Sequence, residues 1–163
     1  MDAAFALSLH PLSYAEANFG IEEGLLEEGA EVEVARRHFS EPLVTDLDVL
    51  ELAELRPGAR SRALSRELAE RYPSSTRCTA EELWEWLCVE WLVAHWDARP
   101  APLEDVDGLT ADFGYPERGL RFAQAAVGSG TRGDVRPTRR QYSGGFAATA
   151  QERARWKSSV LDA

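Results

Sequence analysis

The stretch that most constrains the fold covers residues 79–96 and reads T-A-E-E-L-W-E-W-L-C-V-E-W-L-V-A-H-W. It holds four of the five tryptophans of the chain. Thr79 and Glu82 have the spacing of a capping box, which predicts a helix that begins at Ala80. A helix that is apolar almost all round is normally buried on several sides. The polar side chains of this one form a single strip, at Glu81, Glu82, Glu85 and Glu90.

Two interpretations of the tryptophans are open. As core residues they would each bury on the order of 150–250 Å² and dominate the stability of a domain of this size. As surface residues they would offer a platform for a partner or a nucleotide base, since Trp is favoured at interface hot spots. Their spread around the helix axis favours the core. We therefore expect other helices to pack around this one, and Trp91→Ala to lower stability before it alters binding.

The charge balance argues against one class of function. The chain has 163 residues and a formal net charge of −10, whereas a nucleic-acid binder needs cationic surface to displace counterions from phosphate. Residues 1–55 contain 13 acidic and 2 basic side chains, and residues 128–157 contain 2 acidic and 7 basic ones. This asymmetry predicts a basic protein partner, or pairing between the two ends of the chain.

The cysteines and the N-terminus predict a cytoplasmic protein. Cys78 and Cys88 are ten residues apart, or about 15 Å along a helix, so we expect reduced thiols and no disulfide. Asp2 stands where a signal peptide would carry a basic residue.

Capping boxes and apolar periodicity predict a chain of short helices. The segment 31–36 is ambiguous, because Glu31-Val32-Glu33-Val34 alternates like a strand; we favour a helix that ends near Pro42. With no convincing strand, the predicted fold is all-α: a single-domain irregular helical bundle or helical-repeat-like stack around the Trp-rich helix. The other helices are predicted at residues 14–28, 46–55, 59–72, 103–113 and 120–127, with a last one after Thr149.

The predicted organisation is a helical domain over residues 1–127, a Gly/Arg-rich loop or mobile segment over 128–148, and a C-terminal helix over 149–163 that packs on the same domain. A long unstructured stretch is uncommon in a compact domain unless it is a mobile tail or a working loop. Residues 128–133 match G-x-G-x-x-G. A phosphate-binding loop needs a strand before it and a helix after it, whereas here a predicted helix precedes the motif and Pro137 follows it.

Catalytic and metal-binding motifs are not found. His10, His38 and His95 fall in three separate segments without metal-ligand spacing. No nucleophile elbow or papain-like cysteine context occurs. The sequence thus predicts no catalytic residue, no metal and no cofactor.

The candidate partner-binding residues are charged. A solvated helix face is the ordinary interpretation of the acidic ones, and a docking surface for a cationic partner is the functional one. The acidic candidates are Glu16, Glu22, Glu23, Glu27 and Glu28, and the basic candidates in the glycine-rich segment are Arg132, Arg136, Arg139 and Arg140.

The order of these segments resembles a bacterial family of uncharacterised proteins, DUF2247. Its most distinctive element is the A-D-F-x-Y-P-E stretch at residues 111–117, which follows A-P-L-E-D-V-D at 101–107. The resemblance covers residues 13–126 and departs at Ala125-Ala126-Val127, where the family tends to continue with an aromatic-Met-Pro ending. The other matching segments are residues 13–14, 19–26, 48–53 and 79–106.

The resemblance transfers no activity or catalytic residue. By analogy with other small acidic bacterial proteins, it implies an immunity-like role against a toxin. We expect a non-enzymatic protein-binding protein whose acidic N-terminal third meets a basic partner. One alternative is an adaptor module that uses residues 128–148 as its contact. Another is an enzyme, which would show a deep polar pocket with perturbed titratable groups.

Overall fold

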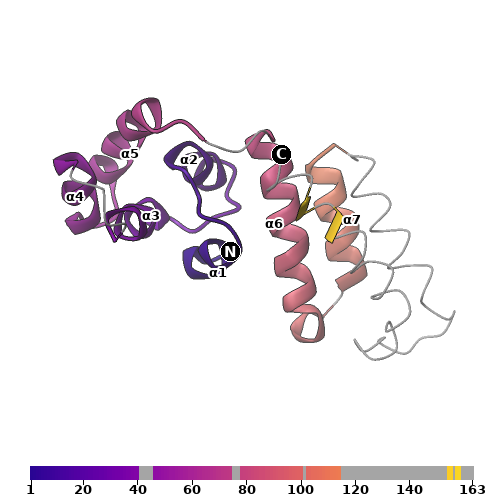
Figure 1. The fold of residues 1–163 in the computed structure, drawn as a ribbon. Helices are drawn as coiled ribbons and strands as arrows, with labels where there is room; N and C mark the ends of the chain where they lie inside the picture. The colour runs from indigo at the N-terminus through magenta and orange to yellow at the C-terminus, as the bar shows by residue number, and fades with distance from the viewer. Residues whose placement is uncertain (41–45, 75–77, 101, 115–153, 156, 159–163) are drawn as a thin grey trace, which may run out of the picture. The chain divides into compact units, whose positions relative to one another are not determined.

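The structure is a computed structural model that describes residues 1–40, 46–74, 78–100, 102–114, 154–155 and 157–158 (Figure 1). These residues form seven α-helices and a 3-10 helix, and no strand occurs among them, so the predicted all-α class is confirmed. The chain divides into two compact units, Met1–Ala80 and Glu81–Ala163. The domain boundaries predicted at residues 127 and 148, and the helix predicted at 120–127, lie outside the described residues.

Unit 1 contains five short helices with local sequence signals at their starts. The capping box at Ser13 and Glu16 is present, with both of its hydrogen bonds. Asp2 caps the first helix by accepting a hydrogen bond from the Phe5 N–H at 2.7 Å; this helix was not among the predicted ones. The bounds are α1 Ala3–Leu9, α2 Tyr14–Glu22, α3 Ala30–Phe39, α4 Leu47–Glu54 and α5 Ala59–Arg71.

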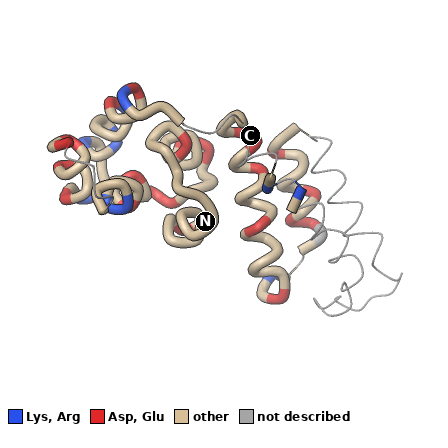
Figure 2. The backbone as a smooth tube through the Cα atoms, viewed as in Figure 1, with Lys and Arg blue, Asp and Glu red and all other residues tan. Residues whose placement is uncertain are grey.

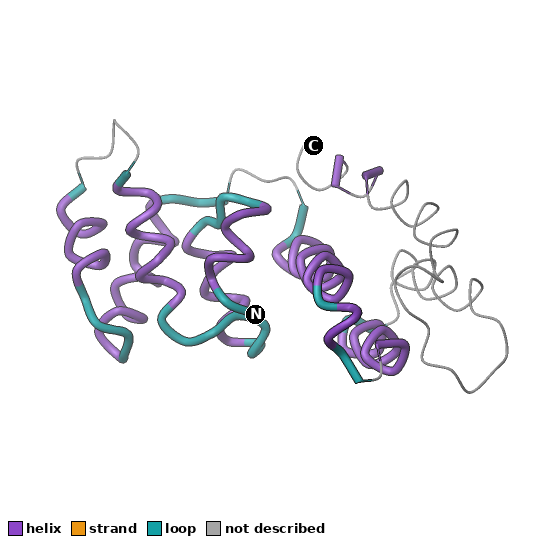
Figure 3. The backbone as a smooth tube through the Cα atoms, turned by 90° about the horizontal axis from the view of Figure 1, so that it is seen from below, coloured by secondary structure: helices purple, strands orange, loops and turns teal. Residues whose placement is uncertain are grey.

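Helix α3 is the hub of unit 1, because it contacts α1, α2, α4 and α5. The five helices lie side by side as short rods (Figure 3).

The helix predicted at residues 31–36 is confirmed, because these residues belong to α3. The strand-like alternation has no structural counterpart, because Glu31 and Val32 are both buried. The buried residues of α3 are Ala30, Glu31, Val32, Val34 and Ala35.

Helix α2 ends at Glu22, six residues before the predicted end at residue 28. Gly24 adopts a φ of +69°, a left-handed conformation that stops a helix and that glycine adopts at low cost. The N–H groups of Leu25 and Leu26 both bond to the Gly20 carbonyl at 2.8 Å. The chain thus turns away at Gly24, inside the helix that was predicted over residues 14–28.

Acidic side chains of unit 1 form ion pairs with the arginines of α5. Figure 2 shows acidic and basic positions interspersed along the helices of unit 1. Glu28 pairs with Arg62, and Glu22 with Arg66 at 2.6 Å. These cations belong to the last helix of unit 1, and the predicted pairing with the basic segment 128–157 concerns residues almost all of which lie outside the described part. Such exposed pairs each contribute about 0–1 kcal/mol.

Unit 2 contains α6 (Ala80–Ala94), the 3-10 helix η1 (Trp96–Ala98) and α7 (Pro102–Asp112). Trp84, Trp86 and Trp96 are at most 2% exposed, as predicted for core residues. Trp91 is partly exposed and Glu85 is buried, so two details of the predicted helix faces are wrong. That α6 is the centre of the whole fold stays a prediction.

Gly29 should tolerate no side chain. Its φ is +92°, and a Cβ there would lie 2.5 Å from Cγ of Pro57. We expect Gly29→Ala to lower the free energy of unfolding by about 2 kcal/mol or more, from left-handed strain and overpacking together. Gly24→Ala is the matched control, because it has the strain but nothing within 4 Å of its Cβ. If urea unfolding shows the same loss of unfolding free energy for both variants, the Pro57 ring moves aside at little cost.

The tryptophans of α6 should differ in their contribution to stability. Trp86→Ala removes a ring that is 1% exposed and should cost about 3–5 kcal/mol. Trp91→Ala should cost clearly less, because part of that ring already meets solvent. Thermal unfolding of the two variants tests this difference. A loss for Trp91→Ala as large as that for Trp86→Ala would contradict the exposure of Trp91.

Candidate functional site

A half-open cleft of about 410 Å³ lies within unit 1. The loop between α1 and α2, the end of α3 and the end of α5 form its walls. Its apolar lining comes from Leu7, Pro11, Leu12, Val34 and Pro73, and its polar lining from Ser13, Tyr14, Glu16, Arg37, His38, Arg71 and Tyr72.

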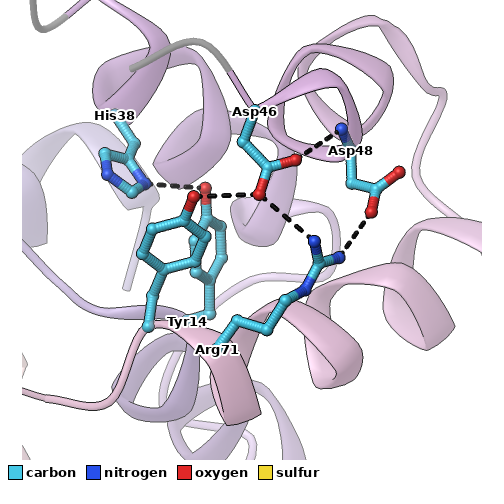
Figure 4. A network of polar contacts seen from close by, with 6 residues as sticks. Tyr14, His38, Asp46, Asp48 and Arg71 are labelled. Atoms are coloured by element: carbon cyan, nitrogen blue, oxygen red, sulfur yellow. Dashed lines mark hydrogen bonds and ion pairs between the residues drawn. The ribbon is translucent and has the colours of Figure 1, made fainter. Parts of the chain in front are cut away.

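One side of the cleft is tied to the start of α4 (Figure 4). The Tyr72 hydroxyl donates to Oδ2 of Asp46 at 2.9 Å. Arg71 donates to the same oxygen at 3.2 Å and to Oδ2 of Asp48 at 2.5 Å. Oδ1 of Asp46 accepts from the Asp48 N–H at 2.9 Å and so caps α4. Asp46 therefore joins the end of α5 to the start of α4.

Three aromatic rings stand beside this network. The Tyr14 hydroxyl lies 3.0 Å from Nδ1 of His38, and Tyr14 is 1% exposed. The rings of His38 and Tyr72 are T-shaped with centroids 5.1 Å apart, and the Tyr14 and Tyr72 centroids are 6.1 Å apart. Rings from α2, α3 and the end of α5 thus support one another, which gives the cleft a fixed wall.

The pKa values of Asp46, Tyr72 and Arg71 are all shifted away from neutral pH. Partial burial acts to raise the pKa of Asp46, but hydrogen bonds from the Asp48 N–H and Tyr72, with the charge of Arg71, bring it below its usual value. The hydrogen bond to Asp46 raises the pKa of Tyr72. The hydrogen bond to Asp48 raises the pKa of Arg71. Asp46 and Arg71 are therefore held ionised, and Tyr72 is held neutral.

Glu16 lies at the buried end of the cleft, and the predicted place on an acidic surface is wrong for it because it is 2% exposed. Its Oε2 accepts from the Ser13 N–H at 2.7 Å, and its Oε1 accepts from Ser74 Oγ at 2.5 Å. Nε2 of His10 lies 3.6 Å from Oε2 and has no hydrogen-bond partner in the described part of the chain. Glu16 thereby holds the segment after α5 against the start of α2.

The other acidic candidates have different surroundings. Glu22 and Glu28 form the ion pairs with α5 described above. Glu27 accepts a hydrogen bond from the Ala3 N–H at 3.1 Å. The side chain of Glu23 is exposed and has no hydrogen-bond or ion-pair partner among the described residues. Arg132, Arg136, Arg139 and Arg140 lie outside the described residues.

A family described as "Uncharacterized protein conserved in bacteria (DUF2247)" matches residues 3–125. The chain belongs to the DUF2247 family. The family match begins ten residues before the predicted resemblance and includes α1. No curated protein and no solved structure matches the chain. The cleft of this DUF2247 protein lies wholly within the matched region.

Sequence reasoning treated the cleft residues of this DUF2247 protein as unrelated. Tyr72 was predicted only as the last residue of a helix over residues 59–72, and His38 only as a histidine without metal-ligand spacing. The available signal was Pro73, which ends α5 and leaves Arg71 and Tyr72 on its last turn. The pairing of Tyr14 with His38 joins residues 24 apart in the chain, and no spacing rule predicts such a contact.

A second cluster of this DUF2247 protein joins α6 to α7. The rings of Trp91 and His95 stack with centroids 4.5 Å apart, and Cζ of Arg99 lies 5.7 Å from the Trp91 ring centre. Arg99 donates two 2.8 Å hydrogen bonds to Asp105, which lower the pKa of that carboxyl. The cluster fastens the turn between the two helices.

Among the described residues, no group of three or more His, Cys, Asp or Glu side chains could hold a metal ion. The helices of the described part are all too short or too polar to cross a membrane. Burial raises the pKa of Cys88 to about 12, so this thiol is a poor nucleophile.

Asp46→Asn should destabilise the protein only where Asp46 is ionised. Because the folded-state pKa lies below 3.8, its stabilising contribution is present above that value and is lost as the pH falls through the folded-state pKa. Asn keeps the cap of α4, so the loss at pH 7 should be at most about 1 kcal/mol.

Urea unfolding over a range of pH tests this expectation, with Glu54→Gln as the control. Glu54 is exposed and has no partner in the described part of the chain. The difference between wild type and Asp46→Asn should disappear at acid pH. A difference that is independent of pH would mean that packing, not charge, connects α4 to α5.

Proposed function

We propose that this DUF2247 protein is a non-enzymatic, cytoplasmic protein that binds another protein, and that the cleft of unit 1 receives a segment of that partner. The observation that supports this proposal is the combination of an apolar wall with a fixed polar wall in one half-open cleft. Specific ligand sites have this combination: apolar groups supply affinity and a few placed polar groups supply orientation.

The electrostatics of the cleft favour binding over catalysis. A general acid or base works best with a pKa near the operating pH. The pKa shifts at Asp46, Tyr72 and Arg71 go the other way. These groups act as fixed hydrogen-bonding partners, which suits a preformed recognition surface.

The shape of the cleft favours a chain segment as its occupant. Its volume of about 410 Å³ holds a few side chains. Pro11, Arg37 and Pro73 at its edge are exposed, so an occupant would stay in contact with solvent on one side. An extended peptide tolerates this exposure because it continues beyond the cleft at both ends. Because the walls already hold one another in place, little ordering cost falls on the protein itself.

A more specific version of the proposal is an immunity-like role, in which the partner is a bacterial toxin. The acidic surface remains the candidate for steering a basic partner, and Glu23 is the acidic candidate best placed for it. The alternative adaptor role rests on residues 128–148, which lie outside the described part.

A photo-crosslinking amino acid placed at Arg37 should give a protein adduct in cells that produce the protein. The same amino acid at Glu23 tests the acidic surface, and Glu67 on α5 is the control, because it is exposed and has no partner among the described residues. We expect adducts at position 37 and not at position 67.

Three results would count against the cleft as the docking site: no adduct at position 37, equal adducts at positions 37 and 67, or adducts at position 23 alone. Mass spectrometry of the adduct names the partner. Expression of that partner with and without this chain, read out as growth, then tests the immunity-like form.

A further inference from the structure

Two carboxylates, Glu16 in the cleft lining and Asp46 beside it, already accept hydrogen bonds from the protein. Both carboxylate oxygens of Glu16 accept hydrogen bonds, from Ser13 and Ser74. Both oxygens of Asp46 do the same, from Asp48, Tyr72 and Arg71. A donor of a ligand would share these carboxylates with donors of the protein, and Glu16, which is 2% exposed, offers it little access.

Some donors of the cleft lining remain available, whereas those of Arg71 and Tyr72 are bonded to Asp46 and Asp48. Arg37 is exposed, and its guanidinium has no ion-pair or hydrogen-bond partner in the described part of the chain. His38 uses Nδ1 for Tyr14, which leaves Nε2 as a donor when the Tyr14 hydroxyl donates to the ring. Ser13 Oγ accepts from the Glu16 N–H, and its own proton remains available. The free polar groups thus call for a ligand with acceptor oxygens.

Arg37 is the cation of the cleft lining whose side chain has no ion-pair partner among the described residues. The charge of Arg71 is compensated by two carboxylates, Asp46 and Asp48. Val34 lies one turn before Arg37 on α3 and belongs to the apolar lining, with Leu7 and Leu12. A cation therefore stands beside an apolar surface, and this pairing suits a carboxylate that is followed by an apolar group.

We infer that the cleft binds an extended protein segment in which an acidic side chain contacts Arg37 and His38 and an adjoining apolar side chain packs against Leu7, Leu12 and Val34. This inference rests on the proposed function and specifies its ligand. A nucleic acid fits worse, because residues 1–80 carry 15 acidic and 8 basic side chains and repel a polyanion. A single carboxylate next to an apolar group meets less of that repulsion than a polyanion does.

Binding of two capped tetrapeptides tests the inference. Acetyl-Ala-Glu-Leu-Ala-amide should bind about tenfold to a hundredfold more tightly than acetyl-Ala-Gln-Leu-Ala-amide, the range expected for hydrogen bonds to a charged group. Arg37→Gln should remove this preference. Arg56→Gln is the control, because Arg56 is exposed, does not line the cleft and has no partner among the described residues. Titration followed by NMR should show the His38 ring shifting with the Glu peptide.

Three outcomes would overturn the inference. In the first, the two peptides bind equally up to millimolar concentration. In the second, Arg56→Gln weakens the preference as much as Arg37→Gln does. In the third, acetyl-leucine binds more tightly than the Glu peptide, which would assign the site to a chain terminus. Circular dichroism of Arg37→Gln checks its fold. If neither peptide binds while a protein adduct still forms at position 37, the proposed protein-binding function stands. Only the inference that the bound segment is acidic is then refuted.

Discussion

The burial of α3 is the constraint on which the rest of unit 1 depends. This helix contacts the four other helices of the unit, and its Glu31 is 0% exposed, with Oε1 accepting from Ser61 Oγ at 2.6 Å. Nε of Arg36 donates to the Ala53 carbonyl at 3.0 Å and ties α3 to α4. The last turn of the same helix carries Arg37 and His38 into the cleft. Core packing and the candidate site are therefore positioned by one element.

Local signals in the sequence predicted most of the fold, and tertiary contacts account for what they missed. The capping box at Ser13 and the α5 span were predictable because their hydrogen bonds and apolar repeat lie within a few residues. The end of α2 depends on Gly24 adopting a left-handed conformation, which many glycines could do. Glu16 and Glu31 are charged residues that the fold buries by giving them serine partners. The number of charged residues in a segment does not show which carboxylates will have such partners in the folded protein.

The cleft was unpredictable for the same reason. Its members come from the α1–α2 loop, α3 and the end of α5, so they meet only once α3 has packed. Charge counts along the chain suggested an acidic face. The fold instead pairs part of that charge with the arginines of α5. The net charge of a segment thus predicts how strongly it attracts a charged partner at long range. The ion pairs formed in the folded structure decide which charged groups remain free to contact that partner.

The two walls of the cleft should respond differently to ionic strength. Arg71 and Asp48 are each 44% exposed, so salt weakens their attraction. Tyr14 and Glu16 are nearly fully buried, and their hydrogen bonds to His38 and Ser74 are screened much less. The shape of the cleft should therefore persist at salt concentrations that weaken a contact between Arg37 and a carboxylate. Loss of binding at high salt would then report on the ligand contact itself and not on unfolding of the site.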